Sequence, residues 1–118
     1  MRNFDYALVY IDKAIKLSKN NDIYKLLKSE IYINKSNIVE AIHILMDLKN
    51  NRIKEGNNKE IRINILLANA YIKKREFEEA ENILLKLIKK HKRLELAYLN
   101  LSILYKEKNQ LSKSREII

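Results

Sequence analysis

Residues 66–87 read LLANAYIKKREFEEAENILLKL, and this stretch decides the fold. The motif L-A-x-x-Y begins at Leu67, before a short polar turn, and the motif F-x-x-A-x-x-x-L begins at Phe77, after it. Apolar residues recur at three- and four-residue spacing on both sides of the turn. This spacing predicts two amphipathic helices joined as a hairpin.

The hairpin pattern is repeated along the chain. Thirty-four residues later, L-S-x-x-Y begins at Leu101 and L-x-x-S-x-x-x-I begins at Leu111. An earlier copy is carried by Ser29, Tyr32, Ala41 and Leu45, and the opening helix adds Phe4, Ala7 and Ile11. An internal period of this length predicts an array of helical hairpins.

The repeat period also defines the organisation of the chain. Ala7 and Ala41 are thirty-four residues apart, whereas Ala41 and Ala80 are thirty-nine apart, so we expect an insertion near residues 49–60, where Gly56 favours a turn. We expect a single domain with four parts: residues 1–21 as the second helix of a partial repeat, 22–60 as the repeat with the insertion, 61–94 as a repeat and 95–118 as a truncated repeat.

No segment alternates with the two-residue period of a strand, so the sequence predicts an all-α fold. We expect about seven antiparallel helices, near residues 4–17, 23–35, 38–48, 59–75, 77–92, 94–108 and 111–118. Asn20, Asn21 and Asp22 are together expected to end the first helix and cap the second, and Asn37 with Glu40 has the spacing of a capping box. Because the pattern starts on a second helix and stops within another, we expect a piece of a longer repeat array. An open reading frame ending at Ile118 would contradict this.

Composition excludes several classes of site. The chain has 118 residues, enough for one domain, and 47% of them are hydrophobic. It has no cysteine, which excludes disulfides, thiolate metal sites and a cysteine nucleophile. No run approaches the ~18 consecutive apolar residues of a membrane span, and Asp5 and Asp12 interrupt any signal core, so we expect a soluble, cytoplasmic protein without membrane contact.

In the residues of its repeated hairpin pattern, the chain resembles tetratricopeptide repeats. In that family the first helix of each repeat carries a leucine, a small residue and then a tyrosine, and the second helix carries a small residue followed by a large apolar one. Leu67, Ala68, Tyr71, Ala80 and Leu84 occupy those places in the middle unit. The resemblance implies a right-handed α-solenoid whose first helices line a concave groove.

The resemblance also implies a protein-interaction scaffold that is not an enzyme and needs no cofactor. Its groove would bind a peptide or helix of another protein, or a second copy of the chain. The groove positions of the first helices are mostly apolar, which favours a covering partner. They are Ile23, Leu26, Glu30, Ile33, Ile65, Asn69, Ile72, Lys73, Leu96, Leu99, Asn100 and Ile103.

One ligand class is not supported by these residues. Repeats of this family that clamp a terminal carboxylate use two asparagines, which Asn69 and Asn100 match, and a lysine where this chain has Ile65. We therefore expect no carboxylate clamp, although both asparagines remain candidates for hydrogen bonds to the backbone of a bound peptide.

Other functions are less favoured by the residues. His43 and His91 stand among polar neighbours, which is typical of surface histidines and not of a metal or general-base site. The net charge of +9 and the basic run of residues 86–93 permit nucleic-acid binding, but cations at the end of a helix also complement its carbonyl groups. Two alternatives stay open: an RNA-binding repeat of the pentatricopeptide kind, suggested by residues 45–55, and self-assembly through the two terminal helices.

Overall fold

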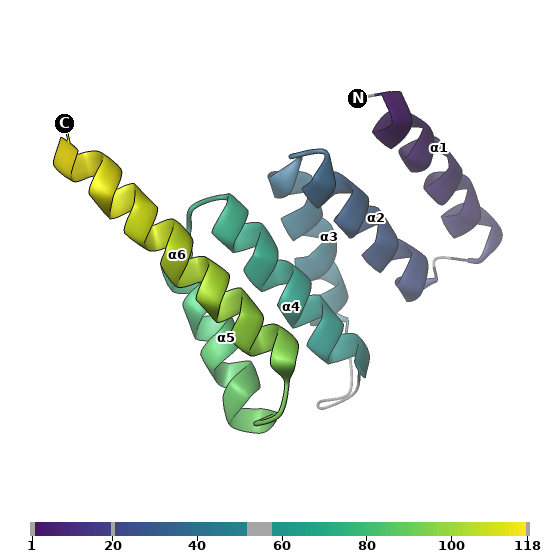
Figure 1. Cartoon of the computed structure of the whole chain (residues 1–118). Helices are drawn as coiled ribbons and strands as arrows, with labels where there is room; N and C mark the ends of the chain where they lie inside the picture. Colours follow the sequence, from purple (N-terminus) through teal and green to yellow (C-terminus); the bar gives the residue numbers. More distant parts are fainter. Residues whose placement is uncertain (1, 20, 52–57, 118) are drawn as a thin grey trace. The chain divides into compact units, whose positions relative to one another are not determined.

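The computed structural model describes residues 2–19, 21–51 and 58–117, with side chains for 3–19, 21–51 and 58–110. The described residues form six α-helices and no strand (Figure 1), which confirms the all-α prediction. Contacts between Cα atoms divide the chain into two compact units, residues 1–53 and 54–118. The boundary lies inside the expected insertion, whose Gly56 is outside the described residues. Among the helices that are described, none combines the length and hydropathy that a membrane span requires.

The first unit contains α1 (Arg2–Leu17), α2 (Asp22–Asn34) and α3 (Ile38–Asn50). Helix α2 packs against both α1 and α3. At the α1–α2 contact, Lys35 Nζ lies 2.6 Å from Asp5 Oδ1 and Lys28 Nζ lies 2.6 Å from Asp12 Oδ1. The buried residues recur at helical spacing along each helix, and they are Ile11, Leu26, Ser29, Ile33, Ala41, Leu45 and Leu48.

The second unit contains α4 (Asn58–Lys73), α5 (Phe77–Lys90) and α6 (Glu95–Ile117). Each of these helices packs against the other two, and the C-terminal end of α6 projects past its neighbours (Figure 1). Arg75 Nη1 lies 3.0 Å from Glu107 Oε2, which joins the α4–α5 turn to α6. One apolar cluster draws on all three helices, and its buried members are Ala68, Ile72, Phe77, Ala80, Leu84, Leu87, Ala97 and Leu104.

The two hairpins α2–α3 and α4–α5 close with the same turn. Ser36 has a left-handed φ of 72° and Arg75 one of 70°. Ser36 N–H donates to the Ile33 carbonyl at 3.0 Å, and Asn37 N–H donates to the Tyr32 carbonyl at 2.8 Å. The corresponding pairs after α4 are Arg75 to Ile72 at 3.0 Å and Glu76 to Tyr71 at 2.9 Å. This is the Schellman pattern, which satisfies carbonyl groups that the end of a helix would otherwise leave without donors.

The predicted number of helices is corrected. The segment expected to be a seventh helix continues α6 to Ile117, so the described residues contain six helices instead of seven. Asn109 stands where the turn at Arg75 ends α4, but α6 continues through Asn109. Around Asn109 there is neither glycine nor proline to stop the helix.

The capping predictions have mixed outcomes. The Asn21 side chain accepts a hydrogen bond from the Ile23 amide at 2.8 Å, which confirms the expected cap of α2. Asn37 is the N-cap residue of α3, but its side chain makes no capping hydrogen bond, so the predicted capping box with Glu40 is wrong. The reason is geometric: Asn37 is also the last residue of the Schellman turn, and its backbone has φ −88° and ψ 68° there.

Candidate functional site

Five of the predicted groove residues are exposed, and most of these are apolar. They are Ile23 on α2, Lys73 on α4, and Leu96, Leu99 and Ile103 on α6. Four more, Glu30, Ile65, Asn69 and Asn100, are half-buried. The predicted groove as a whole draws on α2, α4 and α6, and it stays a prediction.

The remaining three groove residues lie in the interior. Leu26 and Ile33 are each 2% exposed and Ile72 is 4% exposed, so none offers its side chain to a partner. Leu26 and Ile33 continue the stripe that Ser29 occupies on α2, and Ile72 belongs to the core cluster of the second unit. The prediction that these three residues lie on an open face is therefore wrong. The buried faces of α2 and α4 are rotated by about one residue from the predicted faces, and a helical sequence pattern places a face only to about that precision.

Helix α6 carries the densest group of exposed apolar side chains in the second unit. Leu96, Leu99 and Ile103 are 52%, 54% and 40% exposed and follow one another at three- and four-residue spacing. Their side chains therefore lie on one side of the helix. Ala97 and Leu104, on a neighbouring side of the helix, are completely buried. An exposed apolar surface of this kind is typical of a site that contacts another protein.

Two tyrosines lie on another side of α6 and are held by hydrogen bonds. Tyr98 donates its hydroxyl proton to the Lys92 carbonyl at 2.9 Å, and Tyr105 donates to the Glu81 carboxylate of α5. The bond to Glu81 raises the pKa of Tyr105 above its ordinary value of 10.0, because the carboxylate stabilises the neutral phenol. Both rings remain about half exposed.

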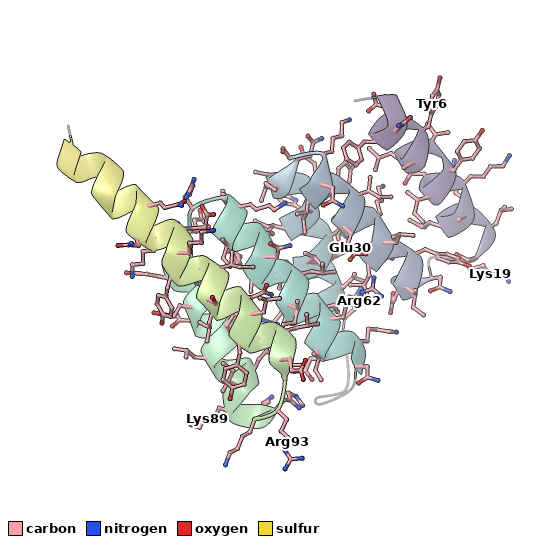
Figure 2. All side chains as sticks on the ribbon, in the orientation of Figure 1. Tyr6, Lys19, Glu30, Arg62, Lys89 and Arg93 are labelled. Carbon is pink, nitrogen blue, oxygen red and sulfur yellow. The ribbon has the colours of Figure 1, made fainter. Side chains whose placement is uncertain are left out.

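Sequence analysis missed a second apolar surface, on α1. Tyr6, Val9, Tyr10 and Leu17 are among its exposed residues, and Tyr6 points outward from the helix in Figure 2. The pattern of Phe4, Ala7 and Ile11 was assigned to the core, but apolar residues also fill much of the remaining circumference of this helix. A count of apolar residues on the outer side of α1 would have revealed them.

Charged residues of α1 contact α2 on a side away from this surface. The Asp5 carboxylate accepts a hydrogen bond from Lys35, and this bond, with the lysine charge, lowers the pKa of Asp5 below its ordinary 3.8. Lys28 pairs with Asp12, and its Nζ also lies 5.7 Å from the centre of the Tyr32 ring. These contacts fix α1 against α2.

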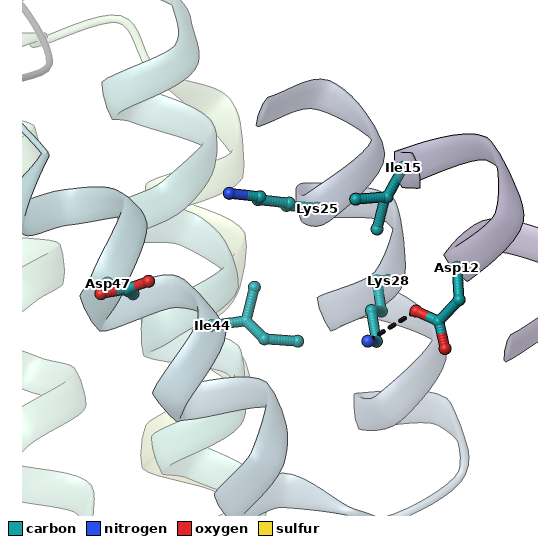
Figure 3. Close-up of a pocket in the computed structure, with 6 residues that line it drawn as sticks. All are labelled: Asp12, Ile15, Lys25, Lys28, Ile44 and Asp47. Carbon is teal, nitrogen blue, oxygen red and sulfur yellow. Dashed lines mark ion pairs between the residues drawn. The ribbon is translucent and has the colours of Figure 1, made fainter. Parts of the chain in front are cut away.

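A small hollow lies among α1, α2 and α3. Its volume is about 190 Å³, and Figure 3 shows six side chains around it: Asp12, Ile15, Lys25, Lys28, Ile44 and Asp47. The lining includes two lysines, two aspartates and two isoleucines, so the charges of these six side chains cancel. Lys28 is paired with Asp12. Sequence analysis did not find this hollow because its residues come from three helices.

The histidines and the basic run lie at the surface. His43 is exposed and His91 is half-buried. Within the described part of the chain, no three His, Cys, Asp or Glu residues are grouped so as to hold a metal ion. Lys89 and Arg93 extend outward near the end of α5 (Figure 2), and Lys89 stands in the last turn, where its charge complements the helix carbonyl groups.

Comparison of the chain with protein-family models, with curated proteins and with solved structures gives no match. The resemblance to tetratricopeptide repeats therefore depends on this chain's own residues and on the turn that it repeats.

Proposed function

We propose that the chain is a non-enzymatic protein-interaction module built from tetratricopeptide-like repeats in a right-handed solenoid, and that it binds a peptide or a helix of another protein. The observation that carries this proposal is the open apolar side of α6, in particular Leu96 and Ile103 with the half-buried Asn100 between them. Apolar anchors beside an amide are the combination that recognises an extended peptide or an amphipathic helix.

The repeated turn supports the assignment of helix types. Because Ser36 and Arg75 close α2 and α4 in the same way, α2 and α4 are both first helices of hairpins, and α6 matches α4 thirty-four residues on. Asn69 of α4 and Ile103 of α6 then occupy the same position, so partner contacts are expected on the same side of both helices. Packed hairpins hold such a surface in one conformation before binding. Most of the conformational entropy lost on binding is therefore lost by the partner.

The proposal is tested with peptides selected from a displayed random library on the immobilised chain. Ile103→Glu places a charge in the apolar surface at a residue that is 40% exposed, so the fold is retained. We expect the selected peptides to bind this variant about tenfold or more weakly than the unaltered chain, a loss of about 1.4 kcal/mol. Ile72→Glu is not a suitable probe, because a charge at that buried position would unfold the second unit.

Two further variants complete the test. Lys108→Glu adds the same charge at an exposed position of α6 outside the group and is expected to leave binding unchanged. Asn100→Ala is expected to weaken binding of extended peptides if the amide bonds their backbone. Peptides that bind the chain equally well with and without Ile103→Glu would overturn the proposal.

A further inference from the structure

Four cationic side chains gather where α5 ends and the turn to α6 begins. We call them the basic cluster, and they are Lys86 and Lys89 on α5 with Lys92 and Arg93 in the turn. All four are exposed, and none forms an ion pair with another residue of the described part of the chain. The neighbouring Lys90, in contrast, pairs with Glu60 at 3.9 Å. Lys89 and Arg93 extend outward near the end of α5 (Figure 2).

Helix stability accounts for only part of the basic cluster. Cations in the last turn of a helix complement its free carbonyl groups, and this effect falls off within that turn. Lys89 stands in the last turn of α5, whereas Lys86 precedes that turn, and Lys92 and Arg93 follow the end of the helix. Lys86 also lies one helical turn from both Lys89 and Lys90, and like charges at these spacings destabilise a helix. Three of the four cations are therefore not explained by the stability of α5.

The turn that carries two of these cations is fixed by hydrogen bonds to the helices on both sides. The His91 N–H donates to the Leu87 carbonyl of α5 at 2.7 Å. The Tyr98 hydroxyl of α6 donates to the Lys92 carbonyl at 2.9 Å. Because these bonds hold the backbone of the turn, an anion that binds there has to order only the side chains of Lys92 and Arg93. The cluster is therefore partly preorganised for binding.

The residue types of the basic cluster favour a nucleic acid over an acidic protein as the anion. Three of the four residues are lysines, and lysine is depleted at protein–protein interfaces. Lysine and arginine are the residues that neutralise the backbone phosphates of nucleic acids. The exposed Glu95 lowers the local charge, but it stands against four unpaired cations. The net charge of the whole chain, +9, has the same sign as the cluster and attracts a polyanion.

We propose that the basic cluster binds the phosphate backbone of a nucleic acid. Lys86 and Lys89 contact the phosphates from the helix, and Lys92 and Arg93 contact them from the turn. Contacts to phosphates carry no sequence information directly, so the affinity is expected to be independent of the base sequence. This goes beyond the proposed function, because both the ligand and the surface differ from the peptide and the apolar side of α6.

Binding through these cations has a defined dependence on salt. Each cation that neutralises a phosphate releases a counterion, and on a single strand the logarithm of the binding constant falls with the logarithm of the salt concentration with a slope of about −0.7 per contact. Contacts from all four residues of the cluster give a slope of about −3. Fluorescence anisotropy of a labelled single-stranded oligouridylate, titrated with the full chain at several salt concentrations, measures this slope.

Two double variants of equal net charge locate the site. Lys89→Gln with Arg93→Gln removes two charges of the basic cluster at exposed positions, so the fold is retained. This variant is expected to bind the oligonucleotide about tenfold or more weakly and to lose about 1.4 from the slope. Lys106→Gln with Lys108→Gln is the matched control, at exposed positions about 16 Å or more along α6 from its first residue. At physiological salt, charges this far away are largely screened, so the control is expected to bind as the unaltered chain does.

Other anions test whether the ligand is a nucleic acid. Polyglutamate has the same sign of charge without phosphates, and phosphatidylserine vesicles present phosphates on a membrane surface. We expect the oligonucleotide to bind at least about tenfold more tightly than either. Polyglutamate or vesicles that bind as tightly would overturn the proposal, and so would a chain that binds no oligonucleotide at low salt. Equal losses in the two double variants would also overturn it, because the total charge and not the basic cluster would then attract the ligand.

Discussion

Ser36 and Arg75 hold the same position in two turns: both have left-handed backbone, and the residue after each donates its amide proton to the carbonyl of a tyrosine, Tyr32 or Tyr71. Neither residue is glycine, although the left-handed region disfavours a side chain with a Cβ atom. The two hairpins therefore carry the same local strain at the same place. Arg75 also pairs with Glu107, whereas Ser36 is exposed, which makes Ser36 the better position for a test.

Ser36→Gly is expected to stabilise the chain by about 0.5–1 kcal/mol, because glycine relieves the strain at positive φ and loses only part of that gain to its greater freedom in the unfolded state. Urea unfolding followed by circular dichroism measures the change. Asn34→Gly, two residues earlier within helix α2, is the control and is expected to give no gain. Equal effects at both positions would contradict the assigned turn.

The sequence was sufficient to predict the helices of both complete hairpins, because each has a continuous apolar stripe and a polar turn. Ala68 and Ala80, the small residues of the repeated pattern, are both fully buried in one cluster. The predicted start of α5 at Phe77 is confirmed as well. These helices are predictable from the sequence because the local pattern and the tertiary packing favour the same helical segments.

The errors have different causes. Helix α6 continues past Asn109, where neither glycine nor proline stops it. Leu26, Ile33 and Ile72 were placed on an open face because a rotation of one residue leaves the helical pattern almost unchanged while it exchanges buried and exposed positions. The apolar surface of α1 was missed because its Phe4 and Ile11 stripe already accounted for a core.

Ala80→Leu is expected to destabilise the chain by about 1–3 kcal/mol, because Ala80 is fully buried in the cluster with Ala68 and leaves no room for a larger side chain. Thermal and urea unfolding measure the loss. Asn82→Leu introduces the same side chain at an exposed position of the same helix and is expected to change stability by no more than about 0.5 kcal/mol. A tolerated leucine at residue 80 would show that the helices do not approach closely there.

Asn64→Leu is expected to raise the free energy of unfolding by about 1 kcal/mol. Asn64 is 9% exposed, and its side-chain Oδ1 has no hydrogen-bond partner among the described residues. A buried acceptor without a donor is unfavourable, and an apolar residue of similar size removes that penalty. Asn82→Leu again serves as the exposed control. A loss of stability in Asn64→Leu would mean that the amide makes a hydrogen bond in solution.

Tyr105 links α6 to α5 through Glu81, and its titration reports this contact. Since the pKa of the folded Tyr105 is raised above 10.0, its contribution to stability is fully present below pH 10.0 and is lost as the pH rises through the raised value. Glu81→Gln removes the charge that favours the neutral phenol, so the pKa of Tyr105 is expected to fall toward 10.0. Nuclear magnetic resonance of assigned, ¹³C-labelled tyrosine measures the shift, and Glu78→Gln, an exposed neighbour in the first turn of α5, is the control expected to leave it unchanged. If Tyr105 titrates at 10.0 in the unaltered chain, the hydrogen bond does not persist in solution, and α6 is held against α5 by its apolar contacts and by the Arg75–Glu107 pair alone.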